Sequence, residues 1–270
     1  MRIGCIGAGN MASAILRGLV AGGKDAGDLC VYDINPDKMR ELSRDCGISL
    51  ASSEEDAICG ADVVILAVKP QVYGSLLPRI RDAIRRTRPL VISIAAGKSI
   101  AGILQVLGED IHIVRVMPNI NAKVGEAITA ICASPLAGEA DVAAARNIFN
   151  AIGETVLLDE SKFSGYAALA GAAPAYTFLF IDALAEAGVR QGIPRDLSLR
   201  IARQTVLGSA VLLRETGAHP RLLLDEVCSP GGITVEGVLS LQRDGMEAAV
   251  VDAVQAACDR DARLMAGEKR

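Results

Sequence analysis

The stretch that most constrains the fold is a short apolar run leading through two glycines into a helical pattern. Residues 3–6 are followed by Gly7-Ala8-Gly9-Asn10-Met11-Ala12 and then by helical spacing over 13–20. The first glycine allows a tight turn, the second lets the backbone approach a pyrophosphate, and the helix N-terminus attracts an anion. We therefore predict dinucleotide contact, rather than a glycine turn with no ligand, at Ile6, Gly7, Ala8, Gly9, Asn10 and Met11.

The first part of the chain alternates short β-branched runs with helical patterns. Strands are predicted at 2–6, 29–33, 62–68, 90–96 and 111–117, and further strands at 127–133 and 155–159 with a helix over 138–151 between them. Strands that are apolar along their whole length are typical of a parallel sheet covered on both faces. We expect an α/β fold, with a Rossmann-type doubly wound parallel sheet over residues 1–160.

The strand signal ends near residue 160, and residues 161–270 show apolar positions at helical spacing. Within this part, residues 163–181 carry no charge for nineteen positions, which is close to the length of a membrane span. Glycine, proline and hydroxyl residues there favour a buried helix broken near Pro174 instead. We expect an all-helical C-terminal domain, whose abundant alanine suits close helix packing and an oligomer interface.

Composition excludes several classes of protein. The net charge is -4 and no block of like charge occurs, so neither a nucleic acid nor a membrane surface is an expected partner. Seven scattered cysteines without C-x-x-C spacing indicate reduced thiols, and two distant histidines offer little for a metal site. The N-terminus lacks the features of a secretory signal. We therefore expect a cytoplasmic protein with no metal.

The residue after the second predicted strand bears on the choice of cofactor. Asp33 follows Gly9 by twenty-four positions, where a carboxylate can accept hydrogen bonds from the adenosine ribose and repel a 2′-phosphate. This position favours NADH over NADPH, with Ile34 as a neighbouring contact. Asp33 has an alternative role as the cap of the helix after Pro36, and Lys38 or Arg40 could still reach a 2′-phosphate.

Several segments that span nearly the whole chain together resemble one enzyme family. The segments are Gly7-Ala8-Gly9-Asn10-Met11-Ala12, Ala67-Val68-Lys69-Pro70-Gln71, Ser93-Ile94-Ala95-Ala96-Gly97, Arg115-Val116-Met117-Pro118-Asn119, Pro174-Ala175-Tyr176 and Ser229-Pro230-Gly231-Gly232-Ile233-Thr234. They are similar to pyrroline-5-carboxylate reductases, the last enzymes of proline synthesis. The resemblance implies an NAD(P)H-dependent imine oxidoreductase that forms L-proline, as a homodimer through the C-terminal helices or a higher homo-oligomer.

Two strand ends are candidate contacts of the dinucleotide. Residues 67–70 end a buried strand at the carboxyl edge of the sheet, where ligands of doubly wound folds bind. The resemblance implies that this segment flanks the dinucleotide through its main chain, and a purely structural lysine is the alternative there. The small residues 95–97 end the next strand and suit contact with a nicotinamide ring, although ordinary packing also uses them. The cofactor candidates here are Ala67, Val68, Lys69, Pro70, Ala95, Ala96 and Gly97.

A second loop precedes a helical run and carries two hydroxyls, which is typical of an anion site. The resemblance implies that this loop holds the substrate carboxylate and that Thr234 lies beside the imine as the catalytic residue, whereas a capping turn is the alternative. Asn119, after the fifth strand, is a further substrate candidate or a loop cap. The substrate-binding candidates are Ser229, Gly231, Gly232, Ile233, Thr234 and Asn119.

The chemistry suits a site with little acid–base machinery. A protonated cyclic imine, the expected small-molecule partner, supplies its own positive charge, so positioning and electrostatics suffice. The family's usual hydroxyls are replaced here at Ala167, Ala170 and Ala172. Two alternatives stay open: a reductase of another cyclic imino acid, such as a piperideine carboxylate, and a catalytically silent NAD-binding regulator. A hydroxy-acid dehydrogenase is disfavoured because no helical G-x-x-x-K pattern follows residue 151.

Overall fold

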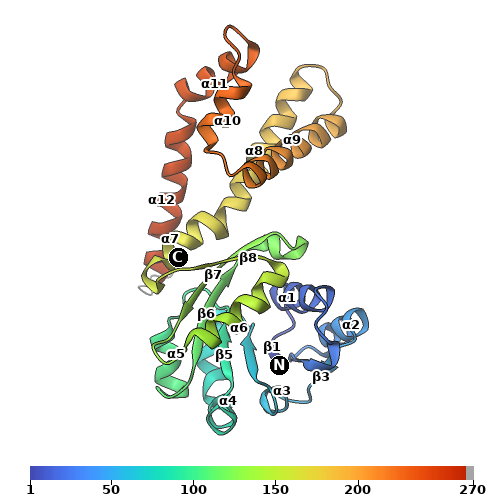
Figure 1. Ribbon diagram of the computed structural model, residues 1–270, viewed down its shortest axis with the longest axis vertical. Helices are drawn as coiled ribbons and strands as arrows, with labels where there is room; N and C mark the ends of the chain where they lie inside the picture. The colour runs from blue at the N-terminus through green and yellow to red at the C-terminus, as the bar shows by residue number, and fades with distance from the viewer. Residues whose placement is uncertain (266–270) are drawn as a thin grey trace. The chain divides into compact units, whose positions relative to one another are not determined.

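The computed structural model describes residues 1–265. Within the described residues the chain divides into two compact units, one made of Met1–Gly171 with residues 260–265 and the other of Ala172–Asp259 (Figure 1). The first unit contains the sheet, and the second is helical. The predicted boundary near residue 160 remains a proposal, and the compact units themselves divide after Gly171.

One eight-stranded sheet forms the centre of the first unit. Its strands are β1 (Ile3–Ile6), β2 (Leu29–Tyr32), β3 (Ser49–Leu50), β4 (Val63–Leu66), β5 (Leu90–Ser93), β6 (Ile113–Pro118), β7 (Ala127–Ala133) and β8 (Gly153–Leu157). The order is β3-β2-β1-β4-β5-β6-β7-β8, and every neighbouring pair is parallel except β6 with β7. The chain reverses its direction across the sheet between β1 and β4, so the crevice at their carboxyl ends is the expected ligand position.

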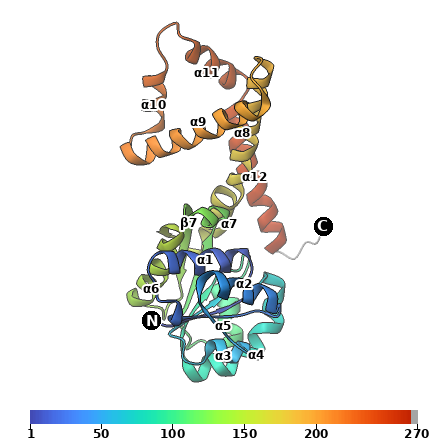
Figure 2. The same cartoon turned by 90° about the vertical axis from the view of Figure 1, so that its right-hand side faces the viewer.

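Helices cover both faces of this sheet (Figures 1 and 2). The helices α1 (Asn10–Ala21), α2 (Pro36–Cys46) and α6 (Glu139–Phe149) pack on one face, and α3 (Glu54–Ile58), α4 (Tyr73–Thr87) and α5 (Ile100–Leu107) pack on the other. Successive strand residues point to opposite faces, so Cys5 joins the first apolar cluster and Ile6 the second. Both are buried, which explains why the strands are apolar along their whole length.

The expected Rossmann-type doubly wound fold is confirmed. The structure adds the short elements β3 and α3, which the sequence pattern did not predict. It also adds the antiparallel pairing of β7 with β6. The two-residue strand β3 has both residues exposed, so it carries no apolar pattern that could have indicated it.

The segment after β8 belongs to the sheet unit although it is helical. It contains η5 (Glu160–Lys162), α7 (Phe163–Tyr166) and a π-helical turn, η6 (Ala167–Ala172). Phe163 and Tyr166 pack with Ala130 of β7, and the Tyr166 hydroxyl donates to the carbonyl oxygen of Ile128 at 2.7 Å. These apolar contacts explain why the segment stays with the sheet unit. The π-helical turn continues directly into α8, so the helical geometry changes just before Pro174 but the predicted break in the helix does not occur.

The second unit consists of helices that include α8 (Ala173–Arg190), α9 (Arg195–Thr216), α10 (Pro220–Val227) and α11 (Ile233–Arg243), and α12 (Met246–Met265) begins in it. The prediction that 163–181 is a buried helix is wrong for the α8 part, because Phe178 is 59% and Leu179 is 72% exposed. A single chain provides no surface to cover them. Among the described residues, one helical stretch, Glu160–Arg190, has the length and apolar composition to cross a membrane.

Candidate active site

The glycine loop after β1 has the backbone that the motif predicts. Gly7 has a φ of +110°, and a Cβ there would lie 2.5 Å from the carbonyl oxygen of Ala67. The Gly7 N–H donates to the carbonyl oxygen of Tyr32 at 2.7 Å, so the loop is tied to β2. Gly9 has an ordinary φ of −76°, and a Cβ there would meet no atom within 4 Å. Packing and backbone conformation therefore explain why residue 7 is glycine, whereas no contact within the protein requires glycine at position 9.

The N-terminus of α1 lacks a side-chain cap and an acidic first turn. Its N-cap is Gly9, no side chain caps it, and its first turn has no acidic residue. By contrast, α2 is capped by the Asn35 side chain and has Asp37 in its first turn. Unpaired N–H groups and the positive end of the helix dipole therefore remain at α1 for an external anion.

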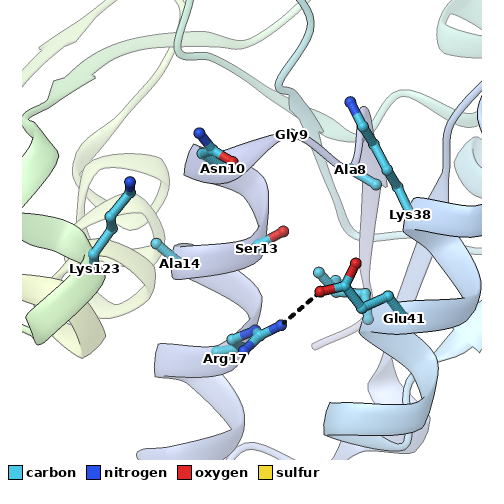
Figure 3. A pocket seen from close by; sticks show the side chains of 10 residues that line it. Ala8, Gly9, Asn10, Ser13, Ala14, Arg17, Lys38, Glu41 and Lys123 are labelled. Carbon is cyan, nitrogen blue, oxygen red and sulfur yellow. Dashed lines mark ion pairs between the residues drawn. The ribbon is translucent and has the colours of Figure 1, made fainter.

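A cavity of about 370 Å³ opens beside this helix end (Figure 3). Lys38 and Lys123 stand at its sides, and neither side chain has an ion-pair partner among residues 1–265. Arg17, one turn further along α1, pairs with Asp45 at 2.5 Å and with Glu41 at 3.9 Å, so its charge is already balanced (Figure 3). The two unpaired ammonium groups add positive charge beside an uncapped helix, which suits phosphate.

A second cavity of about 420 Å³ contains most of the other predicted cofactor residues. Its lining includes Ile6, Gly7, Gly9, Asp33, Ile34, Ala67, Val68 and Lys69. Lys38 lines this cavity as well as the first one, so it stands between them. The predicted Pro70 begins the short turn η2 (Pro70–Val72), and the Met11 side chain packs on the apolar core instead of into either cavity.

Asp33 holds the glycine loop and its own turn together. Its carboxylate accepts the N–H of Ala8 at 2.7 Å and the N–H of Asn35 at 2.8 Å. The cap of α2 is Asn35, whose side-chain oxygen accepts the N–H of Asp37 at 3.0 Å, so the capping role does not fall to Asp33. Two carboxylate oxygens offer about four acceptor sites, so two remain for the hydroxyls of a ribose.

A buried tyrosine supports the edge of the sheet beneath these cavities. The Tyr73 hydroxyl lies 3.1 Å from the carbonyl oxygen of Leu66 and 2.9 Å from the Ser93 hydroxyl, so it joins the ends of β4 and β5. Burial raises the pKa of Tyr73 well above its usual range, and its phenol therefore stays protonated. The neighbouring residues 67–70 and 95–97 start from these fixed strand ends.

The strand ends of β5 and β6 meet at a third cavity of about 340 Å³. Ala96 and Gly97 line it together with Met117 and Pro118, whereas Ala95 is buried in the core. A flat ring has access to the backbone of Ala96 and Gly97, because both residues are exposed. These two are therefore the stronger of the three nicotinamide candidates at this strand end.

Asn119 is more deeply placed than a simple contact residue. Its side chain is 6% exposed, and its Nδ2 donates to the carbonyl oxygen of Ala170 in the π-helical turn at 3.1 Å. Its Oδ1 is buried without a hydrogen-bond partner among the described residues. The side chain thus joins the end of β6 to the π-helical turn and keeps one acceptor free.

The predicted carboxylate loop lies in the second unit, before α11. Gly231 has a φ of +69°, which favours glycine, and a Cβ on Gly232 would lie 2.3 Å from the Ser229 hydroxyl oxygen and 3.1 Å from the Ser229 carbonyl oxygen, so a side chain there would displace that hydroxyl. The Gly232 N–H donates to the Ser229 carbonyl oxygen at 3.0 Å and closes the turn. No side chain caps α11, and within residues 1–265 the hydroxyls of Ser229 and Thr234 have no hydrogen-bond partner. The Ile233 side chain is 93% exposed, so within this chain only the backbone of Ile233 contributes to the loop.

The structure thus gathers the predicted residues into two sets on different units. The dinucleotide candidates surround the carboxyl end of the sheet, and the substrate loop is preformed on the helical unit. Sequence reasoning missed Lys123 as a cavity residue, because it follows a different strand and belongs to no motif. Within residues 1–265 no group of three metal-ligating side chains is found.

The fold and these two sets define a nicotinamide-dependent oxidoreductase. Residues 2–97 match the family described as NADP oxidoreductase coenzyme F420-dependent, and residues 160–264 match pyrroline-5-carboxylate reductase dimerisation. Pyrroline-5-carboxylate reductase of Escherichia coli is 39% identical over 97% of this chain and 98% of its own length. The enzyme of the same name from Arabidopsis thaliana is 38% identical over 97% of this chain and 95% of its own length.

Solved structures agree with these relatives. A pyrroline-5-carboxylate reductase from Coxiella burnetii superposes with a TM-score of 0.94 at 33% identity, covering 97% of this chain and 98% of that one. The Plasmodium falciparum pyrroline carboxylate reductase, with NADP bound, gives 0.85 at 31% identity and covers 98% of both chains. This chain belongs to the pyrroline-5-carboxylate reductase family.

Proposed function

We propose that this protein reduces the C=N bond of Δ1-pyrroline-5-carboxylate to give L-proline, with NAD(P)H as the reductant. The observation that carries this proposal is that one chain contains both an uncapped glycine-loop helix and a preformed Ser-Pro-Gly-Gly-Ile-Thr loop. Its relatives of that name match it along nearly the whole length. A silent regulator has no need of a carboxylate loop.

The residues around the sheet edge fit a dinucleotide. The helix N-terminus at Gly9 and Asn10 would hold the pyrophosphate, with Lys38 and Lys123 nearby, and Asp33 would accept the adenosine ribose hydroxyls. The exposed backbone of residues 96–97 would lie against the nicotinamide ring. When bound, the reduced cofactor supplies the hydride that the imine carbon accepts.

Asp33 and its surroundings favour NADH over NADPH. A carboxylate that is fixed by two backbone N–H groups repels a 2′-phosphate at the ribose. Ile34 is 86% exposed and offers no charge, and Arg40 is paired with Asp37 at 2.5 Å. Lys38 and Lys69 also line this cavity, so a 2′-phosphate has cations within the same cavity. Because the fixed carboxylate of Asp33 opposes that phosphate, NADPH is expected to bind as the weaker cofactor.

The second loop would bind the substrate carboxylate. Backbone N–H groups at an uncapped helix end and the hydroxyls of Ser229 and Thr234 would form an anion site, and the positive φ of Gly231 gives the loop its shape. Thr234 would lie beside the imine as the catalytic residue. A protonated imine already carries positive charge, so these residues need only bind and orient it.

We further propose a homodimer in the cytoplasm, formed through the C-terminal helices. The exposed side chains of Phe178 and Leu179 on α8 form an apolar surface that a second copy would cover. Residues 160–264 match a family described as a dimerisation domain, which supports the same arrangement. A higher oligomer built from such dimers is compatible with it.

One observation favours a second candidate, the reduction of a six-membered piperideine carboxylate. Ala167 lines the cavity beside Ala96 and Gly97, at a position where the family usually has a hydroxyl. An alanine in place of a hydroxyl residue leaves more room in the cavity for a six-membered ring and removes one possible hydrogen bond to the substrate.

The test is oxidation of NADH, and separately of NADPH, with pyrroline-5-carboxylate, piperideine carboxylates and a 2-keto acid as alternative substrates. We expect the highest kcat/KM with pyrroline-5-carboxylate and NADH. A higher value with a piperideine carboxylate would establish the second candidate, and no turnover despite NADH binding would establish a regulator.

A further inference from the structure

Arg115 is a buried charge that the proposed reaction does not use. It lies on β6, two residues before Met117, and its side chain is 4% exposed. Its Nη1 is 2.8 Å from Oε1 of Glu160, and its guanidinium carbon is 4.5 Å from the centre of the Phe163 ring. Its Nε is buried without a partner among the described residues. A guanidinium in this state is costly to bury.

Glu160 also accepts a hydrogen bond from a second element. The same carboxylate oxygen, Oε1, accepts the N–H of Ile100 at 2.8 Å. Ile100 is the first residue of α5 and comes three positions after Gly97, with Ser99 as the cap between them. One oxygen therefore joins the guanidinium on β6 to the segment that leaves β5.

This connection borders the cavity at the nicotinamide end of the site. Arg115 and Glu160 line that cavity together with Ala96 and Gly97. Between Ala95, which is buried, and Ser99, which caps α5, Ala96 and Gly97 are exposed and Gly97 has a φ of +69°. The hydrogen bond that the Ile100 N–H donates to Glu160 fixes the far end of this stretch, and the one that the Ile94 N–H donates to the Leu66 carbonyl oxygen at 3.3 Å fixes its near end.

A buried ion pair is weak support for stability, because apolar residues of similar size often stabilise as well or better. A role in shaping the site explains the Arg115–Glu160 pair better than stability does. We propose that Arg115 is a positioning residue that acts through Glu160 to fix segment 95–99, against which the nicotinamide ring lies. This inference rests on the proposed function, since it assigns a task within that reaction.

The first test compares the wild-type enzyme with the double variant Arg115→Met/Glu160→Met. Methionine has similar length and no charge, so the double variant removes the connection without leaving a buried unpaired charge. We expect kcat to fall on the order of tenfold to a hundredfold, because displacements of about 1 Å at a reacting ring have effects of this size. The KM values for NADH and for the imino acid should stay within about twofold, since the groups proposed to bind the two ligands are other residues.

The readout that separates positioning from stability is the kinetic isotope effect with NADH deuterated at the reactive carbon. A loosened segment slows hydride transfer, so the isotope effect on kcat should rise above the wild-type value. Arg115→Lys keeps the charge and should recover part of the lost kcat. Glu160→Gln keeps an oxygen for the Ile100 N–H and should lose less than Glu160→Ala. Arg86→Met removes an exposed ion pair with Glu55 and is the matched control, with kcat unchanged.

If the double variant folds and its kcat and isotope effect are unchanged, the proposal is overturned. A raised KM for the imino acid with kcat unchanged would also overturn it, because Arg115 would then contact the substrate directly. If the double variant does not fold, Glu160→Gln and Glu160→Ala are compared instead. A smaller loss of kcat in Glu160→Gln supports the proposal, and an unchanged kcat in both variants overturns it. Failure of the proposed function is distinguishable, because the wild-type protein itself would then not turn over pyrroline-5-carboxylate.

Discussion

Substituting each loop glycine by alanine separates the two reasons for which this chain uses glycine. At Gly9 an alanine fits the fold, because φ is −76° and a Cβ meets nothing within 4 Å. Alanine is a poorer N-cap than glycine by up to about 1 kcal/mol, and the lower entropy of the unfolded chain offsets about 0.4–1 kcal/mol. The free energy of unfolding should therefore change by less than about 1 kcal/mol, or about 4 °C in Tm.

In the proposed cofactor site, the same Cβ would stand where the pyrophosphate approaches the backbone. Losing one charge-assisted hydrogen bond costs about 1.5–3 kcal/mol, which corresponds to a rise of roughly tenfold to 150-fold in the Kd for NADH. Gly7→Ala is the contrasting variant, because its φ is +110° and its Cβ would lie 2.5 Å from a carbonyl oxygen. Backbone strain and overpacking together predict about 2–6 kcal/mol of lost stability there.

The assay is titration of NADH by fluorescence, with thermal unfolding of the same samples. Weak NADH binding at a wild-type Tm for Gly9→Ala, next to a strongly lowered Tm for Gly7→Ala, is the expected pattern. Wild-type affinity in Gly9→Ala would refute the position of the pyrophosphate. A Tm loss in Gly9→Ala as large as that in Gly7→Ala would refute the argument from open space.

Four further predictions follow from other parts of the structure. Asp33→Ser with Ile34→Arg should raise the NADPH to NADH ratio of kcat/KM about tenfold or more by replacing a repelling charge with a phosphate partner, and an unchanged ratio would contradict the ribose assignment. Thr234→Ala should raise the KM for the imino acid roughly tenfold with the NADH KM unchanged, and wild-type kinetics would remove Thr234 from the site. Burial raises the pKa of Cys5 from 9.0 to about 12, so the stability that the protonated thiol contributes is complete below pH 9 and is lost as pH rises toward 12. Between pH 8 and pH 10 the free energy of unfolding in urea should therefore fall less for Cys5→Ala than for the wild-type protein, and equal falls would contradict this cause. Leu179→Glu should shift the protein toward monomer in sedimentation, because the side chain is 72% exposed on the proposed interface, whereas an unchanged dimer would place the interface elsewhere.

Local patterns were sufficient to predict the main part of the fold. Strands buried on both faces are apolar throughout, so each long parallel strand was recognised within a few residues of its observed bounds. The glycine loop was equally clear, since the steric need at Gly7 is visible in the motif itself. Features without an apolar pattern were missed, such as β3 with its two exposed residues and the short α3.

The rest depends on contacts between distant parts of the chain or between chains. The exposure of Phe178 cannot be read from an apolar helix, because a buried helix and an interface helix have the same composition. The helix cap at Asn35 instead of Asp33 depends on which side chain turns toward the loop. The pairing of Arg115 with Glu160 joins residues 45 positions apart, and no local pattern predicts it.

The central claim is that a hydride passes from the nicotinamide to the imine carbon of pyrroline-5-carboxylate. The direct measurement uses NADH deuterated at the reactive carbon and mass spectrometry of the amino acid formed. We predict L-proline with one deuterium on the ring carbon that was doubly bonded to nitrogen. Turnover without deuterium in proline, or NADH oxidation without proline, would contradict the claim.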